Sequence, residues 1–322
     1  MIDFGREVRK ASERILPYIR ETPLEYSHKL SELTDAPVYV KLENLQHTGS
    51  FKTRGALNKL LSLSMGQREK GVVAASTGNH GAAVSYGLSQ LGAKGIVFVP
   101  ENAKPTKIEG IRRYGAEVKA HGNDGVITET HARQYAEEHD MAFISPYNDA
   151  QVIAGQGTIA SELVKQLETL DVVFVSVGGG GLISGIAGFL KSLNSNVTVV
   201  GCTPDQAPIM YESIRQGHIV TLPNLPTLSD GTAGGLEPGA ITFNLCQALV
   251  DVHVLVTEAE IRHAMLTFME AHHMMIEGAA GVAIAGCLKL KEQFRGLNSA
   301  VIICGGNIGL DSLKNLLDGP LL

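Results

Sequence analysis

Cysteine is scarce in this chain of 322 residues, and the four cysteines are far apart in the sequence. Cys202, Cys246, Cys287 and Cys304 form no Cys-x-x-Cys pair and no spacing typical of a disulfide framework. Residues 1–20 alternate charged and apolar side chains and show no signal-peptide pattern. These absences predict a protein of the reducing cytoplasm.

Positive charge is not in excess either. Lysine and arginine number 27 against 33 aspartates and glutamates, which gives a formal net charge of -6. Such a chain has no general electrostatic attraction for nucleic acid or for an anionic membrane surface. A small-molecule partner is therefore predicted.

A membrane span is not predicted, although residues 172–190 carry no charge. The length of this stretch approaches that of a span, but six of its residues are glycines and four of those are consecutive. Glycine weakens a helix in lipid and in water alike. A buried strand, a glycine turn and a helix explain the stretch better.

Short β-branched runs alternate with helical patterns from residue 71 onward, which is typical of a parallel sheet covered by helices. Two blocks of this alternation, in a chain that is 44% hydrophobic, predict an α/β fold with two domains. Residues 221–240 are rich in proline and glycine and are predicted to be an irregular loop. Helices are expected at Asn79–Leu91, up to Arg113, at Thr128–His139, up to Glu168, at Leu182–Leu193, at Glu258–His272 and at Gly278–Leu290.

Four consecutive glycines, Gly178, Gly179, Gly180 and Gly181, lie between an apolar strand and a helix. Glycines let backbone N–H groups converge, and a helix N-terminus adds partial positive charge, so the loop is predicted to hold a phosphate. A plain turn needs one or two glycines. The Walker A pattern fails because Leu182 follows, and no third glycine completes Gly-x-Gly-x-x-Gly. A phosphate monoester therefore fits better than a nucleotide.

A second polar turn, residues 76–81, also follows a strand and opens a helix. Ser76, Thr77, Asn79 and His80 place hydroxyl, amide and imidazole groups over backbone N–H groups that can hold a carboxylate. A helix N-cap followed by a turn explains the same residues equally well. His80 taken alone indicates a structural hydrogen bond rather than a base.

Cys304 ends an apolar strand and precedes two glycines. A buried cysteine most often acts as a small hydrophobic residue. The alternative is a neutral partner for a ligand heteroatom, and the position at a strand end favours it.

Lys52 follows Phe51 near the expected start of a helix. A positive helix N-terminus and burial beside an aromatic ring both lower the pKa of a lysine. A lowered pKa favours the free amine that a Schiff base requires. Most lysines are solvated surface charges, so Lys52 is singled out only because it accompanies the phosphate loop and the carboxylate-binding turn.

Five motifs, GSFKTRGA, STGNHG, GGGGLISG, EGAAG and CGGN, occur in this order. Together they resemble the fold-type II pyridoxal phosphate enzymes, in the branch of threonine/serine dehydratases and serine racemases, from about Thr22 to Asn307. The resemblance implies that Lys52 forms the Schiff base with pyridoxal 5'-phosphate. It also implies that Phe51 stacks on the cofactor ring and that Asn79 binds the ring hydroxyl.

The resemblance assigns the remaining site residues as well. Gly178–Gly181 and the Leu182 N–H would hold the cofactor phosphate, and Cys304 would face the pyridine nitrogen. The substrate carboxylate would be held by the turn formed by Ser76, Thr77, Gly78, Asn79 and His80.

Family architecture implies a tryptophan synthase β-like fold with two domains, each having a mainly parallel twisted sheet flanked by helices. Residues 49–146 would form a small mobile domain, and residues 1–48 and 147–322 would form a large one. Homodimers and homotetramers are common in the family, so one of these assemblies is expected.

The activity implied is that of a hydroxyamino-acid ammonia-lyase, which eliminates water from L-threonine, L-serine or a related β-hydroxy amino acid to give a 2-oxo acid and ammonia. Lys52 would be the general base at Cα. Amino-acid racemisation is the weaker alternative, because Thr77 stands where such racemases use a serine as the opposite-face acid. A dehydratase specialised for hydroxyaspartate, phenylserine or a hydroxyectoine-derived amino acid is a further alternative.

No metal is expected at the position known in serine racemases. Those relatives carry a glutamate and an aspartate six residues apart, and here Thr203 and Ile209 occupy the two positions. Two rivals from other classes stay open. One is a β-replacement enzyme of the cysteine synthase kind, which normally has threonine where His80 stands, and the other is a catalytically silent protein that binds the cofactor or a phosphate.

Overall fold

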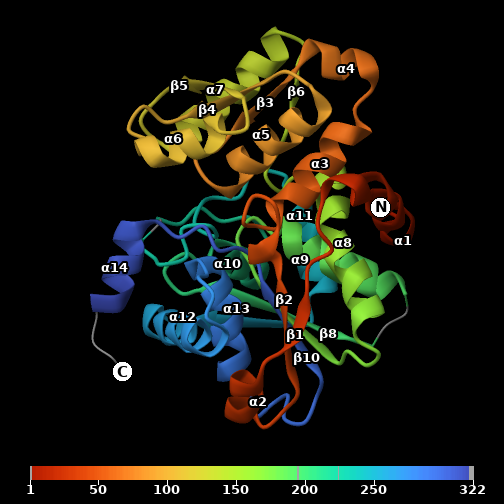
Figure 1. The fold of residues 1–322 in the computed structure, drawn as a ribbon, viewed down its shortest axis with the longest axis vertical. Helices are drawn as coiled ribbons and strands as arrows, with labels where there is room; N and C mark the ends of the chain where they lie inside the picture. The colour runs from red at the N-terminus through yellow and green to blue at the C-terminus, as the bar shows by residue number, and fades with distance from the viewer. Residues whose placement is uncertain (1, 194–195, 224, 319–322) are drawn as a thin grey trace.

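The computed structural model describes residues 2–193, 196–223 and 225–318 (Figure 1). The two ends of the predicted large domain, residue 1 and residues 319–322, therefore lie outside the described residues. So do residues 194–195 and position 224, which belongs to the predicted loop 221–240. The rest of that loop forms no helix or strand, as predicted.

Two sheets occupy separate lobes of the described chain (Figure 1). Every strand pair is parallel except that of β1 with β2, which confirms the α/β fold with mainly parallel sheets. The larger sheet has the order β1 (Leu24–Tyr26), β2 (Val38–Leu42), β10 (Ser299–Ile303), β7 (Val172–Ser176), β8 (Thr198–Pro204) and β9 (Val252–Val256). The smaller sheet has the order β5 (Glu117–Ala120), β4 (Gly95–Val99), β3 (Val72–Ala75) and β6 (Ala142–Phe143).

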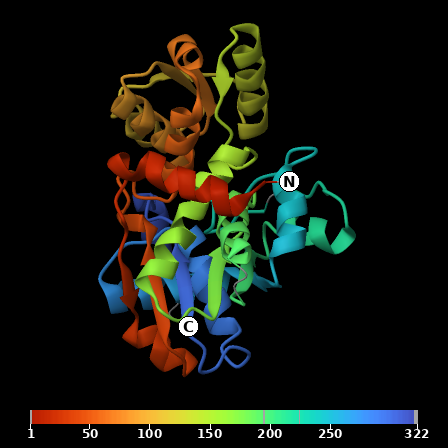
Figure 2. The ribbon, with the colours of Figure 1, turned by 90° about the vertical axis from the view of Figure 1, so that its right-hand side faces the viewer.

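The helices fall into three groups by position (Figures 1 and 2). Those of the smaller lobe are α4 (Met65–Lys70), α5 (Asn79–Leu91), α6 (Pro105–Arg112) and α7 (Gly125–Glu138). At the waist between the lobes lie α1 (Phe4–Ile15) and α3 (Lys52–Ser62), which pack on each other and on α8 (Ala150–Gln166). The larger lobe holds α2 (His28–Thr34), α9 (Gly181–Ser192), α10 (Ile209–Gln216), α11 (Ile241–Leu249), α12 (Glu258–His272), α13 (Gly278–Lys289) and α14 (Leu310–Asp318).

The predicted helices Asn79–Leu91 and Glu258–His272 have the predicted bounds. Other ends were wrong by a few residues. Helix α7 begins three residues before the predicted Thr128, because Asp124 Oδ1 accepts from two backbone N–H groups of its first turn and caps it there. Helix α8 ends at Gln166, two residues before the predicted end.

The larger sheet is buried on both faces, which is why its central strands are apolar without alternation. All residues of β7 and β10 are buried, and α13 packs across both strands. The smaller sheet has its own apolar clusters, one including residues of α3 and α5 and another including residues of α7. Ligands of such sheets bind beyond the carboxyl ends of the strands.

None of the described helices combines the length and the apolar character that a bilayer crossing requires.

Candidate active site

The segment that leads into α3 is hydrogen-bonded to the segment that follows β10. Phe51 N donates to Cys304 O at 3.0 Å, and Gly306 N donates to Gly49 O at 2.9 Å. Because Lys52 is the first residue of α3, these bonds place the candidate nucleophile next to the end of the central strand.

The Lys52 amine is enclosed between the two lobes. Its Nζ donates to Pro146 O at 2.8 Å and lies 5.2 Å from the centroid of the Phe51 ring, which is itself buried. Burial lowers the pKa of Lys52 to about 8, against the opposing influence of Cys304 and Glu277. The direction agrees with the prediction, and the amine can lose its proton near neutral pH.

Neighbouring residues pack closely against the four-glycine loop, whereas no side chain caps the helix that follows it. A Cβ at Gly179 would lie 2.5 Å from the Tyr147 ring, and one at Gly178 would lie 2.8 Å from the backbone of Thr232. Gly180 has a φ of +81°, in the left-handed region. It is the N-cap of α9 and supplies no side-chain acceptor to the first turn. The N–H groups at the start of α9 therefore remain available for an anion.

The turn at residues 76–80 also precedes a helix whose first backbone N–H groups have no side-chain cap. Gly78 is the N-cap of α5, and no side chain caps this helix start. Ser76 Oγ accepts from Gly78 N at 3.1 Å, which shapes the turn, and Thr77 is partly exposed beside it. The turn thus presents backbone N–H groups and a threonine hydroxyl together.

His80 makes the structural hydrogen bond that its sequence context predicted. The buried ring donates from Nε2 to Ile144 O over 2.8 Å, since a carbonyl oxygen can only accept. Burial, together with the charge of Lys52, lowers the pKa of His80 to about 3. The imidazole is therefore neutral near pH 7.

Asn79 is held by two residues to which the sequence assigned no role. Its Nδ2 lies 2.9 Å from each carboxylate oxygen of Glu277, and its Oδ1 accepts from Asn307 Nδ2 at 2.7 Å. Both residues stand in the motifs EGAAG and CGGN. An acidic residue directly before an apolar helix was the only signal that could have drawn attention to Glu277.

Cys304 is buried at the end of β10 and accepts a weak hydrogen bond at Sγ from Ser176 Oγ, 3.6 Å away. Burial raises the pKa of this thiol well above its usual range, so the group is neutral. A ligand atom that reaches Cys304 meets a neutral thiol and not a charge.

Residues 15–305 match the family described as pyridoxal-phosphate dependent enzymes. The chain belongs to this family. An L-threonine ammonia-lyase of Thermotoga maritima is 39% identical over 318 residues, which cover 98% of this chain and 78% of that protein. A catabolic L-threonine dehydratase of Escherichia coli is 38% identical over 312 residues, 96% of this chain and 94% of that protein. The crystal structure of a serine racemase from Dictyostelium discoideum has a TM-score of 0.88 at 38% identity and covers 95% of this chain and 98% of that one.

The donor set of this pyridoxal-phosphate dependent enzyme fits its cofactor. Pyridoxal 5'-phosphate needs an amine for its aldehyde and an anion seat for its phosphate. The amine of Lys52 with its lowered pKa and the uncapped glycine start of α9 provide these two groups. The Lys52 amine is bound to the carbonyl of Pro146, and the next residue, Tyr147, covers Gly179, so both groups face one region.

A buried ion cluster behind α3 was missed in the sequence. Arg54 is fully buried and forms two-point contacts with Glu43 and Glu162, at 2.5 to 2.9 Å. Lys41 Nζ donates to the same Glu162 at 2.6 Å. The cluster connects the first turn of α3 to β2 and α8, and thereby supports the helix that carries Lys52. Charges in the otherwise apolar run VYVKLE were the only local hint.

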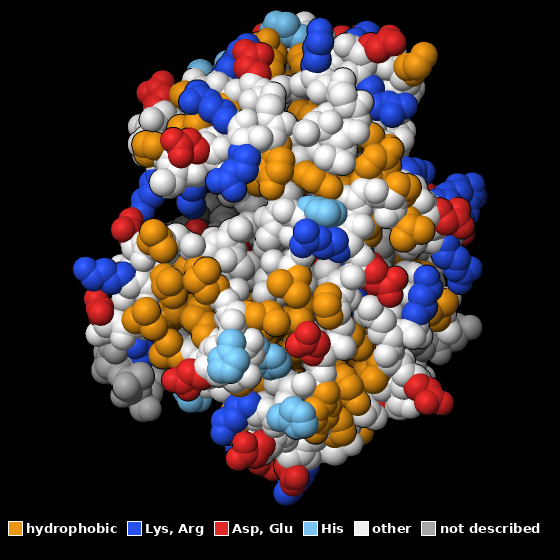
Figure 3. All heavy atoms as spheres, viewed as in Figure 1, with side chains coloured by type: hydrophobic (Ala, Val, Ile, Leu, Met, Phe, Trp, Pro, Cys, Tyr) orange, Lys and Arg blue, Asp and Glu red, His pale blue; other side chains and the backbone are white. Residues whose placement is uncertain are grey.

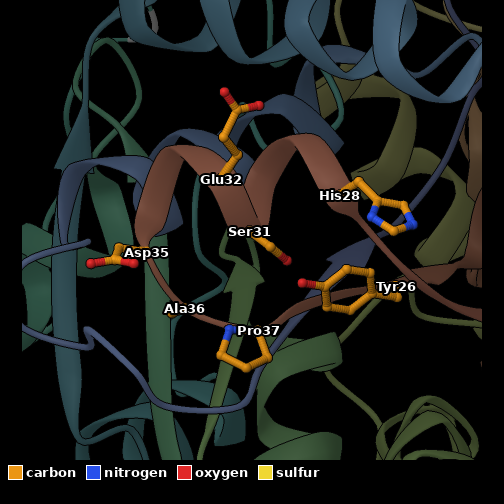
Figure 4. A pocket seen from close by; sticks show the side chains of 7 residues that line it. All are labelled: Tyr26, His28, Ser31, Glu32, Asp35, Ala36 and Pro37. Carbon is orange, nitrogen blue, oxygen red and sulfur yellow. The ribbon is translucent and has the colours of Figure 1, made fainter.

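The surface of the enzyme is hollowed between the two lobes (Figure 3). A separate hollow lies against α2, and none of the predicted site residues lines it (Figure 4). Its lining consists of Tyr26, His28, Ser31, Glu32, Asp35, Ala36 and Pro37.

The two positions of the racemase metal site are apolar or neutral here. Thr203 is buried in β8, and the buried Ile209 begins α10. Among the residues that the structure describes, no three His, Cys, Asp or Glu side chains are grouped to hold a metal. The expectation that no metal binds stays a prediction.

Proposed function

We propose that this enzyme is a hydroxyamino-acid ammonia-lyase that eliminates water from L-threonine, L-serine or a related β-hydroxy amino acid, giving a 2-oxo acid and ammonia. The observation that carries the proposal is the enclosed amine of Lys52, with a pKa of about 8, beside the neutral Cys304. The relatives named for threonine deamination, which match nearly the whole chain, support it.

Each site residue receives a role in this proposal. When bound, pyridoxal 5'-phosphate supplies an aldehyde for an amine and a ring that stabilises negative charge at Cα. The α9 start, with Gly178, Gly179, Gly180, Gly181 and the Leu182 N–H, would hold its phosphate. Phe51 would pack on its ring, Asn79 would donate to its ring hydroxyl, and Cys304 would present a neutral thiol to its ring nitrogen.

Lys52 moves the proton. With cofactor and substrate bound, Nζ of Lys52 would accept the proton from the substrate Cα. A pKa of about 8 suits this task, because such an amine both accepts and returns a proton near neutral pH.

The turn at residues 76–80 orients the substrate. Its backbone N–H groups at the uncapped start of α5 bind the substrate carboxylate, with Ser76, Gly78, Asn79 and His80 forming the turn. The Thr77 hydroxyl lies in the same turn, where it contacts the carboxylate and is the candidate opposite-face acid. The carboxylate contact fixes which Cα bond meets Lys52.

A panel of β-hydroxy amino acids tests the reaction, with ammonia and 2-oxo acid measured with and without magnesium. We expect release from L-threonine or L-serine, no magnesium requirement, and no release by Lys52→Ala. Hydroxyaspartate and phenylserine belong in the panel, because the loop at residues 229–239, whose Thr232 backbone lies against Gly178, can shape the pocket for the substrate side chain. A protein that binds the cofactor and releases no ammonia from any member contradicts the proposal. Sulfide-dependent product from an activated serine identifies a β-replacement enzyme.

Racemisation is the second candidate, because the serine racemase from Dictyostelium discoideum has the same fold at 38% identity. Chiral chromatography of serine after incubation with the enzyme measures it directly. We expect D-serine to form more slowly than ammonia, since Thr77 carries a methyl group on the face where the second proton is delivered.

Three larger-scale features belong to the proposal. All strands of the smaller sheet lie within residues 72–143, which supports a small mobile domain of residues 49–146 against a large domain of residues 1–48 and 147–322. A decrease in the radius of gyration, measured by small-angle scattering on substrate addition, tests the motion of the small domain.

A homodimer or homotetramer in the cytoplasm is proposed from the family, and light scattering coupled to size-exclusion chromatography measures the assembly.

A further inference from the structure

Glu277 is a buried acid at a site where the chemistry described so far gives it no task. It is 5% exposed, and no lysine or arginine forms an ion pair with it in the part of the chain that the structure describes. Its donors are neutral amides: Asn79 Nδ2 and the backbone N–H of Asn307, 3.2 Å away. Burial raises the pKa of this carboxyl. A group so costly to bury needs a reason to be there.

The Asn79 amide is fixed at both ends. The two carboxylate oxygens of Glu277 lie side by side at the same 2.9 Å from Nδ2, so a single N–H of Asn79 faces both. On the other side, Asn307 Nδ2 donates to Asn79 Oδ1 and also to the Thr48 carbonyl, at 2.8 Å. A carboxylate can only accept and the amide NH2 group of Asn307 can only donate, so the Asn79 amide has one permitted orientation. One N–H of Asn79 remains without a partner among these contacts.

The backbone is shaped to admit this chain of residues. A Cβ at Gly305 would lie 2.7 Å from Glu277 Oε1, and Glu277 N donates to Gly305 O at 3.1 Å. Gly49 has a φ of +72°, and a Cβ there would lie 2.6 Å from Asn307 Oδ1. Larger residues at positions 49 and 305 would displace both partners of Asn79.

We propose that Glu277 is a positioning residue, which together with Asn307 fixes the Asn79 amide so that one N–H is presented to an oxygen of the cofactor ring. Glu277 acts through Asn79 and not on the cofactor itself. The inference rests on the role proposed above for Asn79, and it does not depend on which amino acid is the substrate.

A double-mutant cycle on cofactor affinity tests this action. The full-length protein is freed of cofactor and titrated with pyridoxal 5'-phosphate, without substrate, for the wild type, Glu277→Gln, Asn79→Ala and the double variant. We expect Glu277→Gln alone to weaken binding about 10- to 100-fold, by analogy with the loss found when residues that orient metal ligands are changed. In the Asn79→Ala background the same change is expected to cost less than about threefold, because the group that it orients is gone.

A loss of equal size in both backgrounds overturns the proposal, because Glu277 would then act independently of Asn79. Unchanged affinity in Glu277→Gln overturns it as well. Since no substrate is present, failure to release ammonia contradicts the proposed reaction and leaves this result intact. The exposed Glu292→Gln is the control and should bind like the wild type.

Asn307→Asp provides a second route if Glu277→Gln unfolds, which circular dichroism melts will show. The new carboxylate would place an acceptor against Asn79 Oδ1, and the amide of Asn79 would lose its permitted orientation. We expect weakened cofactor binding in a protein with near-native ellipticity. Wild-type affinity in a folded Asn307→Asp protein contradicts the proposal.

Discussion

Lys52 shows how strongly one side chain depends on its surroundings. The residue begins a helix, contacts a buried aromatic ring and donates to the backbone carbonyl of Pro146. A lysine in water has a pKa of 10.5, and burial lowers that of Lys52 to about 8. The amine therefore reaches its reactive form at a pH where ordinary surface lysines are charged.

The pH dependence of cofactor uptake follows from this pKa. Only the unprotonated amine attacks an aldehyde, so the uptake rate of the cofactor-free protein should be small below pH 7, rise through a midpoint near 8 and level off above it. Stopped-flow absorbance measures the rate. A midpoint near 10 would show an ordinary lysine.

Two variants control that measurement. Lys52→Ala should give no covalent adduct in mass spectra after borohydride reduction. Lys70→Ala removes an exposed lysine at the end of α4 and should leave rate and midpoint unchanged.

Among the elements, the starts of α5 and α9 differ from those of six other helices. Six helices, α1, α2, α4, α7, α8 and α12, have a side-chain oxygen that caps the first turn. Helices α5 and α9 have glycine N-caps and no such acceptor. Uncapped N–H groups are costly unless something else accepts from them, so these two starts are suited to anionic groups of cofactor and substrate.

Gly179→Ala tests the crowding over the phosphate loop. The added methyl group would meet the Tyr147 ring at 2.5 Å, so the loop or the ring must shift, and we expect cofactor affinity to fall at least tenfold. Tyr147→Ala in the same chain should recover part of the loss. Gly66→Ala is the matched control, because a Cβ there meets nothing within 4 Å and alanine favours helix α4. Equal affinities of Gly179→Ala and wild type would refute this account of the loop.

The ion cluster behind α3 holds this helix against β2 and α8. Arg54→Leu would leave the carboxylates of Glu43 and Glu162 without their shared partner in a buried place. We expect the free energy of unfolding to fall by about 3–5 kcal/mol in urea titrations, the usual loss when one member of a buried pair is removed. Arg295→Leu, which removes an exposed pair with Asp35, should change little. If the free energy of unfolding falls no more for Arg54→Leu than for Arg295→Leu, the ion cluster does not have the stabilising role assigned to it.

Across the whole molecule, ion pairs connect the smaller lobe to the larger one around the site. Lys104 Nζ lies 2.9 Å from Asp311 Oδ2, and Lys107 Nζ lies 3.5 Å from Asp230 Oδ2. Both pairs are exposed and individually weak. They connect the start of α6 to α14 and to the loop between α10 and α11. We therefore expect them to affect how closely the two lobes approach each other, and not the folding of either lobe.

Charge reversal tests this connection. Lys104→Glu with Lys107→Glu places like charges across the gap, and we expect KM for the amino acid to rise about two- to tenfold at low salt, with the unfolding midpoint unchanged. The difference should shrink at high salt, because the screening length is about 10 Å at 0.1 M. Reversing Asp230 and Asp311 to lysine in the same chain should restore KM. Persistence of the KM change at high salt would argue against an electrostatic cause.

Sequence patterns predicted the elements well where local signals agree. The bounds of α5 and α12 were correct because each helix starts directly after a strand at a residue that marks a helix start. Gly78 precedes α5, and Thr257 with Glu260 caps α12. Strand β2 received no prediction, because Lys41 and the following Glu43 are charged and yet buried. Their burial depends on Arg54 and Glu162, which no local pattern connects to them.

The chemistry of the cofactor could be read from the chain because it resides in short-range features: an amine at a helix start, four glycines between a strand and a helix, and a thiol at a strand end. The partners of those groups could not. Asn79 is bound to Glu277 and Asn307, 198 and 228 residues away, and Lys52 to a carbonyl 94 residues away. Such contacts arise only when the carboxyl ends of distant parallel strands are brought to one edge, so packing alone decided the orientation of Asn79 and the lowered pKa of Lys52.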